Sequence, residues 1–220
     1  MELDSSERTR LFERYGRRYP AGKPVYIEGE QADLCYLLQE GRVRLTKRVR
    51  GVEHSIGILK PGEIFGEDSL VTRAHRASSA IALTDMSVLA FDRETFGALL
   101  SGNPNVGFRL LEQLVNRLHD AEERLENTML RDHPSRVINT LLRMATMIKP
   151  MEGTYAVDIS PLELSSRVGL DVDAVKQVIA QLRDGGYLRI HAERVVILDI
   201  EALKRLYELL GVKEQVNEVP

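Results

Sequence analysis

A heptad repeat in the middle of the chain constrains its fold more than any other feature. Between Asn103 and Arg131, apolar and small residues recur at steps of three and four, as in a helix that packs against a partner helix. The residues on this stripe, called the seam below, are Leu111, Leu114, Leu118, Ala121, Leu125 and Thr128. Polar neighbours such as Glu112 and Arg117 favour a narrow stripe that faces a partner. The sequence therefore predicts a helix that joins two domains and pairs two copies of the chain. The alternative is a helix that packs through its seam on its own domain.

The composition is that of a globular protein with one or two domains. Of the 220 residues, 43% are hydrophobic and 29% are charged, and no run approaches the roughly 18 apolar residues of a membrane span. The N-terminus has no apolar signal-peptide core, so we expect a cytoplasmic protein that does not bind membranes. A single cysteine, Cys35, excludes an intrachain disulfide and a multi-cysteine metal site; its alternating surroundings predict a buried thiol, and we predict no metal site.

The segment before the seam has the sequence pattern of an all-β domain. Residues 5–16 predict a short amphipathic helix, and from Pro20 to Phe91 short β-prone runs alternate with glycines, as in a barrel or jelly roll. The expected strands are Pro24–Ile27, Cys35–Gln39, Arg42–Lys47, His54–Leu59, Ala80–Ala82 and Met86–Phe91. Most of the glycines fit tight turns with positive φ.

One turn in this domain differs from the others. Pro61–Leu70 contains Gly66 and Glu67, and Arg76 follows Glu67 by nine residues. Exposed backbone amides and an arginine bind phosphate, and a carboxylate accepts a hydrogen bond from a sugar hydroxyl. Together these residues predict a pocket for a phosphate and a ribose.

The segment after the seam reads as a small helical module. Asp132 is expected to cap a helix over Ser135–Ile148, followed by a turn at Pro150–Gly153 and a strand at Thr154–Ile159. Ser160 and Glu163 then form a capping box, and Gly169 stands at the turn of a helix-turn-helix. Two further segments complete the module: a hairpin, or wing, over Asp184–Ile190 and Glu193–Leu198, and a helix over Glu201–Gly211.

These motifs resemble the CRP/FNR family of bacterial regulators over nearly the whole chain. The similar stretches are Gly29–Leu38, Glu40–Val43, the turn Pro61–Glu67, the long helix and the C-terminal helix-turn-helix. The resemblance implies an α+β protein with three parts. Residues 1–102 would form a cyclic-nucleotide-binding-type β-roll (a double-stranded β-helix) with an N-terminal helix, residues 103–131 a coiled-coil dimerisation helix, and residues 132–220 a winged helix-turn-helix.

For the effector site, the resemblance places Gly66, Glu67 and Arg76 on a ribose phosphate. The family's hydroxyl after the arginine is replaced by Ala77, and Ser78 would face the opposite side of a strand from Ala77. The family's Thr-Ser pair, which contacts adenine, is replaced by Ala121 and Glu122. Two interpretations remain open. Either the pocket binds a nucleotide other than cyclic AMP, with Glu122 accepting from a base, or Glu67 and Arg76 pair with each other and the roll needs no ligand.

For the DNA-reading surface, the matching positions also diverge. The family's recognition helix opens with Ser-Arg-Glu-Thr, whereas this chain has Asp171 to Ala174, and Ser160–Arg194 holds five Lys/Arg against five Asp/Glu. The candidate contacts are Ser160, Asp171, Asp173, Lys176, Gln177, Arg183, Arg189, His191 and Arg194. A winged helix that has lost DNA affinity and binds proteins is the alternative.

The sequence therefore predicts a homodimeric, DNA-binding transcription regulator. Its partners would be promoter DNA, a second copy of the chain and, as the resemblance implies, RNA polymerase. No nucleophile–base pair or Walker loop is recognisable, so we do not expect an enzyme, and the only cofactor to consider is a cyclic nucleotide.

Overall fold

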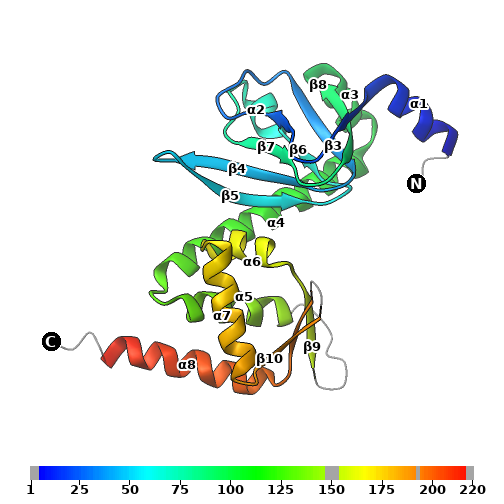
Figure 1. Cartoon of the computed structure of the whole chain (residues 1–220). Coiled ribbons are helices and arrows are strands. Elements are labelled where there is room, and N and C mark those ends of the chain that lie inside the picture. The colour runs from blue at the N-terminus through cyan, green and yellow to red at the C-terminus, as the bar shows by residue number, and fades with distance from the viewer. Residues whose placement is uncertain (1–4, 147–153, 192–193, 217–220) are drawn as a thin grey trace. The chain divides into compact units, whose positions relative to one another are not determined.

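The structure is a computed structural model that describes residues 5–146, 154–191 and 194–216 (Figure 1). The chain forms two compact units, Met1–Arg117 and Leu118–Pro220, and helix α4 (Pro104–Met129) belongs partly to each. The predicted α+β fold, with a β-roll, a long helix and a helix-turn-helix, is confirmed. Among the described helices, none has the length and apolar character needed to cross a membrane.

The first unit is a β-roll of two four-stranded sheets. One sheet has the order β1-β8-β3-β6 and the other the order β2-β7-β4-β5. The strands are β1 (Gly16–Tyr19), β2 (Pro24–Tyr26), β3 (Leu34–Glu40), β4 (Val43–Val49), β5 (Val52–Leu59), β6 (Ile64–Phe65), β7 (Ser79–Ala82) and β8 (Met86–Asp92). The helices of this unit are α1 (Ser5–Tyr15), α2 (Glu67–Thr72), α3 (Arg93–Gly102) and the first part of α4.

Alternation along the strands builds two cores on opposite faces of the first sheet. On β3, Tyr36 and Leu38 point into a core shared with the second sheet, whereas Cys35 and Leu37 point into a core shared with helical residues such as Phe96. Cys35 is fully buried, as predicted, and burial raises the pKa of its thiol to about 12. The first sheet is therefore covered on both faces.

The second unit is a winged helix-turn-helix around one core. It contains the rest of α4, then α5 (His133–Thr146), β9 (Tyr155–Asp158), α6 (Pro161–Val168), α7 (Val172–Asp184), β10 (Leu188–His191), β11 (Arg194–Ile197) and α8 (Ile200–Val216). The strands form a sheet of order β10-β11-β9. Asp132 caps α5 as predicted, accepting a hydrogen bond from the Ser135 amide at 2.7 Å.

Helix α4 turns a polar face toward its own chain in both units. Its buried residues are Glu123 and Asn127, and Asn127 is completely inaccessible. In the second unit, Asn127 donates to the Thr140 hydroxyl at 2.9 Å and accepts from the Asn139 amide at 3.0 Å. These bonds attach the C-terminal part of α4 to α5.

The seam of α4 is exposed. The leucines at 111, 114, 118 and 125 expose between 41% and 61% of their surface, and Ala121 and Thr128 are also exposed. Phe108, Val115 and Met129 extend the same apolar stripe and are exposed too. The alternative in which the seam packs on its own domain is therefore wrong.

Several elements differ from the sequence-based expectation. Helix α4 is slightly shorter than Asn103–Arg131, and three elements were not predicted: β1, β6 and α3. Strand β1 begins at Gly16, which the sequence assigned to the preceding helix; a Cβ there would lie 2.3 Å from the Phe12 carbonyl oxygen, so only glycine permits the turn. The predicted turn at Pro150–Gly153 and residue Glu193 of the wing lie outside the described residues.

We predict that Asn127→Ala lowers the unfolding free energy by about 1–3 kcal/mol, because the buried Thr140 and the half-buried Asn139 lose their hydrogen bonds along with Asn127. Urea unfolding followed by circular dichroism measures the change. The matched control is Glu126→Ala, one residue away, which breaks only an exposed pair with Arg143 and should lose less than about 1 kcal/mol. Equal losses for the two variants would contradict the role assigned to Asn127.

Candidate functional site

The predicted phosphate-binding turn is built around Gly66, between β6 and α2. Gly66 is buried and has a φ of 74°, in the left-handed region that glycine adopts without strain. A Cβ at this position would lie 2.6 Å from Nη1 of Arg76. Glycine is therefore required here both by the backbone conformation and by the close approach of the arginine.

Arg76 is buried in the roll, with only 4% of its surface exposed. Its Nη1 donates to the Gly66 carbonyl at 2.8 Å, and its Nη2 donates to the Leu34 carbonyl. The guanidinium lies 4.1 Å from the ring centre of Tyr26, whose pKa is raised by burial, so the phenol stays neutral. The Nε of Arg76 is buried and has no hydrogen-bond partner among the described residues. The arginine is held in place by neutral groups and keeps one unused donor.

Glu67 is also buried, but its partner is not the predicted one. Its Oε1 lies 2.7 Å from Nη1 of Arg117, on α4, and the interpretation in which Glu67 pairs with Arg76 is wrong. Burial raises the pKa of the Glu67 carboxyl, and the nearby Arg117 guanidinium offsets part of that effect. The second oxygen, Oε2, is buried and has no hydrogen-bond partner among the described residues.

Helix α4 is attached to this turn through two residues one helical turn apart. The Gln113 side chain accepts from the Ile64 amide at 2.8 Å and donates to the Ile64 carbonyl at 2.7 Å. Arg117 donates to the same carbonyl as well as to Glu67. Sequence reasoning treated Gln113 and Arg117 only as polar flanks of the seam. Their four-residue spacing puts them together on one side of the helix, beside the seam, and was the available sign that they share a partner.

The remaining predicted effector residues are distributed as follows. Arg76 and Ser78 are buried and Ala77 between them is exposed; all three precede β7, so the strand that was expected here begins only at Ser79. The Ala77 carbonyl accepts a hydrogen bond from Lys47 at 3.2 Å. Ala121 and Glu122 are exposed on α4, in the part of that helix that belongs to the second unit.

The turn fits part of a nucleotide. The unused donor of Arg76 suits an anionic phosphate oxygen, and the unused acceptor of Glu67 suits a sugar hydroxyl. The chemistry of the turn therefore suits a phosphate and a ribose.

In the second unit, the helix-turn-helix forms as predicted, and two candidate DNA contacts act as caps. The Ser160 hydroxyl and Glu163 form a capping box at the start of α6, and Gly169 ends that helix with a φ of 68°. Asp171 caps the recognition helix α7, accepting from the Ala174 amide at 2.7 Å. The polar groups of Ser160 and Asp171 are thus already used by the fold.

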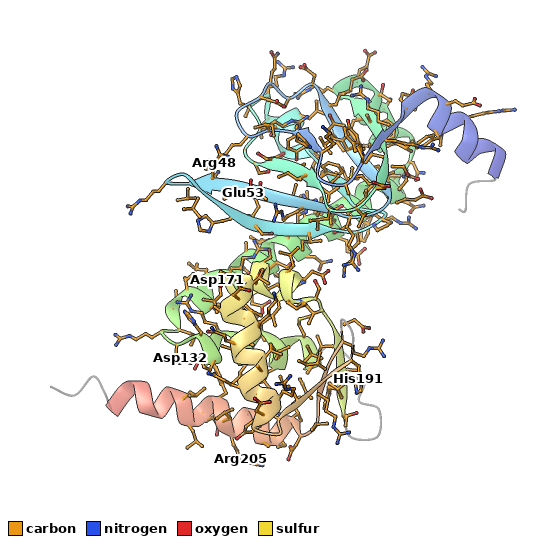
Figure 2. The ribbon with its side chains drawn as sticks, viewed as in Figure 1. Arg48, Glu53, Asp132, Asp171, His191 and Arg205 are labelled. Carbon is orange, nitrogen blue, oxygen red and sulfur yellow. The ribbon has the colours of Figure 1, made fainter. Side chains whose placement is uncertain are left out.

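Most candidate cations on this surface carry an acidic partner. Lys176 lies 3.4 Å from Asp173, and Arg183 lies 2.8 Å from Asp184. Arg194 on the wing binds Asp158 on β9, and this hydrogen bond raises the pKa of its guanidinium. Figure 2 shows the side chains of this unit, with His191 at the end of β10. Gln177, Arg189 and His191 are exposed, and the described residues offer them no hydrogen bond or ion pair.

A roll with a phosphate-binding turn, a long helix and a winged helix-turn-helix define a class of transcription regulators whose DNA-binding domain follows a nucleotide-binding-type domain. Residues 16–103 match the cyclic nucleotide-binding domain family, and residues 135–206 match the Crp-like helix-turn-helix domain family. These two matches cover the roll and the winged helix described above.

Individual relatives agree with these matches. The chain is 31% identical to the cyclic AMP receptor protein of Thermus thermophilus over 192 residues, which cover 86% of this chain and 87% of the relative. It is 29% identical to a CRP-like cAMP-activated global transcriptional regulator of Mycobacterium tuberculosis, covering 85% of each chain. Among solved structures, a CRP/FNR-family regulator from T. thermophilus matches with a TM-score of 0.60 and 26% identity, covering 88% of this chain and 98% of the other. The chain belongs to the CRP/FNR family of transcription regulators.

We predict that Arg117→Ala lowers the unfolding free energy by about 2 kcal/mol near pH 7.5, because Glu67 loses the partner that compensates its buried charge. Without Arg117 the raised pKa of Glu67 rises further in the folded state. Stability of the variant should therefore fall as the pH rises through that pKa and recover in acid, where a protonated Glu67 needs no partner. Urea unfolding of wild type and variant at about pH 7.5 and about pH 5 measures this difference.

The control for this prediction is Arg109→Ala, which removes an exposed arginine from the same helix and should have little effect at either pH. In the background of Glu67→Gln, Arg117→Ala should lose its pH dependence. If the unfolding free energy falls by the same amount at both pH values, Arg117 stabilises the fold only through its hydrogen bond to the Ile64 carbonyl.

Proposed function

We propose that this chain is a homodimeric CRP/FNR-type regulator in which two copies pair along the seam of α4 and present two winged helices to promoter DNA. Its effector is a ligand other than cyclic AMP, or it acts without one. The observation that carries the proposal is the exposed apolar stripe of α4 on a helix whose polar side is used by its own chain.

The dimer follows from the burial pattern. Leu111, Leu118 and Leu125 each leave more than half of their surface exposed, on one helix and at heptad spacing. Burying a leucine side chain contributes about 1.5–3 kcal/mol, so covering the stripe with an identical one is strongly favourable. In a two-fold dimer each residue of the stripe meets the same stripe on the partner.

DNA binding is proposed for the pair of winged helices, with half-sites about one helical turn apart. On α7, the proposed base contacts are Gln177, which would bind adenine through two hydrogen bonds, and Asp173, which would accept from a cytosine amino group. Lys176, Arg183, Arg189 and Arg194 are the proposed phosphate contacts. RNA polymerase remains a predicted partner, and we place the protein in the cytoplasm with its DNA. Its relatives are regulators, and catalysis forms no part of the proposal.

The effector proposal rests on two observations: the roll has polar atoms without partners in its phosphate-binding turn, and the chain lacks the hydroxyls that bind cyclic AMP in the family. The unused atoms of Arg76 and Glu67 support a ligand with a phosphate and a hydroxyl. Ala77, Ala121 and Glu122 supply none of the three hydroxyls through which the family binds cyclic AMP, although the M. tuberculosis relative is named for activation by cAMP. Each missing hydrogen bond forfeits about 0.5–1.5 kcal/mol, which favours a different nucleotide or none.

A second candidate function has specific support. The ion pairs of Lys176, Arg183 and Arg194 reduce the positive charge available to DNA, and residues 118–220 hold 13 Lys/Arg against 17 Asp/Glu. In this second reading the winged helix is a protein-interaction module without DNA affinity. Fluorescence anisotropy of the wild-type protein with promoter fragments at low salt distinguishes the DNA-binding function from the protein-interaction function, because affinity for nucleic acid is strongest at low salt.

We predict that Leu118→Lys/Leu125→Lys converts a dimer into a folded monomer, because both leucines are exposed in the single chain and buried only by the partner. Light scattering should give twice the mass of one chain for the wild-type protein and the mass of one chain for the variant. Circular dichroism should be unchanged, and promoter affinity should fall at least about tenfold as half-sites bind independently. Leu209→Lys, an equally exposed leucine on α8, should remain dimeric. A monomeric wild-type protein would refute the pairing.

We predict that the wild-type protein gives little or no heat with cyclic AMP in calorimetry, whereas Ala77→Ser/Ala121→Thr/Glu122→Ser gains affinity by about tenfold or more. The three added hydroxyls restore the polar contacts of the family's cyclic-AMP-binding members. Ala98→Ser, which adds a hydroxyl at an exposed position on α3, should change nothing.

The same titration should be made with cyclic GMP and cyclic di-GMP. Heat from one of these would identify the class of effector, and heat from none would leave the ligand-independent form of the proposal. Tight binding of cyclic AMP by the wild-type protein would contradict the effector proposal directly.

A further inference from the structure

The hairpin of β4 and β5 extends beyond the sheet that anchors it. Strand β4 pairs with β7 only over Val43–Thr46, and from Lys47 onward it pairs with β5 alone. All eight residues of Lys47–His54, called the hairpin arm here, are exposed. Figure 1 shows the arm reaching past β7 as a two-stranded ribbon.

The arm is strongly basic. Residues 42–50 include five Lys/Arg and no acidic residue. The single acid of the arm, Glu53, is the cross-strand neighbour of Arg48, but its carboxylate binds Arg44 at 3.0 Å instead (Figure 2). The Arg48 backbone amide donates to the Glu28 carboxylate at 3.0 Å, whereas the side chains of Arg48 and Arg50 have no hydrogen bond or ion pair within the part of the chain that the structure describes. Both guanidinium groups are therefore available to an anionic partner.

The tip of the arm keeps an arginine where the backbone disfavours one. Arg50 and Gly51 form the two-residue turn with φ values of 51° and 84°, so both lie in the left-handed region. Such turns favour Asn-Gly or Gly-Gly, because most side chains are strained there. Val49 and Val52 pair across the strands beside the turn and expose 51% and 58% of their surface.

The unit that carries the winged helix is acidic overall, so its own contribution to neutralising DNA phosphates is small. Affinity for DNA depends on the number of phosphates neutralised by Lys and Arg. Residues 118–220, which include the winged helix, have four more acidic than basic residues, and three of the candidate cations are already ion-paired. The densest run of basic residues in the printed sequence that also lies on a protruding element is the arm.

We infer that the hairpin arm binds the phosphate backbone of double-stranded DNA through Arg48 and Arg50, and so supplies a sequence-independent contact in addition to the winged helix. A two-stranded ribbon fits a DNA groove in width, and an apolar pair at its tip suits contact with sugar and base edges. The inference rests on the proposed function, namely that the dimer binds DNA.

The test is the salt dependence of binding to a fluorescein-labelled duplex of random sequence, measured by anisotropy between about 50 and 200 mM salt. The variant is Arg48→Gln/Arg50→Asn. Asparagine is favoured at the first position of this turn, so the variant removes two charges without disturbing the hairpin. We expect the slope of log K against log salt to become shallower by about 2 for each arm that contacts DNA, which is about 0.9 per lost phosphate contact.

The matched control is Lys23→Gln/Arg73→Asn. It also removes two exposed charges from the roll, and Arg73 has the same left-handed backbone as Arg50, with a φ of 58°. The control should keep the wild-type slope. If Arg48→Gln/Arg50→Asn keeps both the wild-type affinity and the wild-type slope, the arm does not contact DNA, and its charge would then serve an acidic protein partner. If the wild-type protein itself binds no DNA at low salt, the proposed function fails, and the inference fails with it.

Discussion

Helix α4 turns its polar face toward its own chain and its apolar face outward, which reverses the usual arrangement of an amphipathic helix. Gln113 and Arg117 bind the backbone and the carboxylate of the phosphate-binding turn, and Asn127 binds two side chains of α5. Because hydrogen bonds hold the helix to each unit, the apolar stripe is left free for a partner helix. Dimerisation, attachment to the roll and attachment to the winged helix thus use different faces of one helix.

The buried charges of the phosphate-binding turn each have their own partners, so the turn is stable without a ligand. Arg76 is neutralised by no carboxylate; carbonyl oxygens and the Tyr26 ring hold it, while Glu67 is matched by Arg117. Removing one partner of a buried ion pair leaves an uncompensated charge and destabilises the fold more than the intact pair does, so both residues are retained. The turn is therefore a stable part of the fold, and its two unused polar atoms are what distinguishes a binding site from a purely structural one.

Sequence reasoning succeeded where a pattern is local. The alternating stretch around Cys35 correctly predicted a buried thiol, and the capping box at Ser160 and the turn at Gly169 follow from chemistry within a few residues. It failed where the partner is distant. The partner of Glu67 lies 50 residues away on α4, and no local pattern separates Arg117 from Arg76 as its match. Short elements such as β6, with two residues, leave no periodicity to detect.

The two α4 residues that bind the turn differ in how a ligand at Arg76 would affect them. Gln113 binds the backbone amide and carbonyl of Ile64 and, among the described residues, makes no hydrogen bond with Glu67 or Arg76. Arg117 differs, since it binds a carboxylate whose second oxygen is buried and has no hydrogen-bond partner among the described residues. Under the proposed function, a phosphate-bearing ligand at Arg76 would add negative charge beside Glu67 and strengthen the hold of the turn on Arg117. This ion pair is therefore one route by which an effector would act on α4. An effector that binds the two states of the helix equally would have no effect, because only a difference in binding shifts a conformational equilibrium.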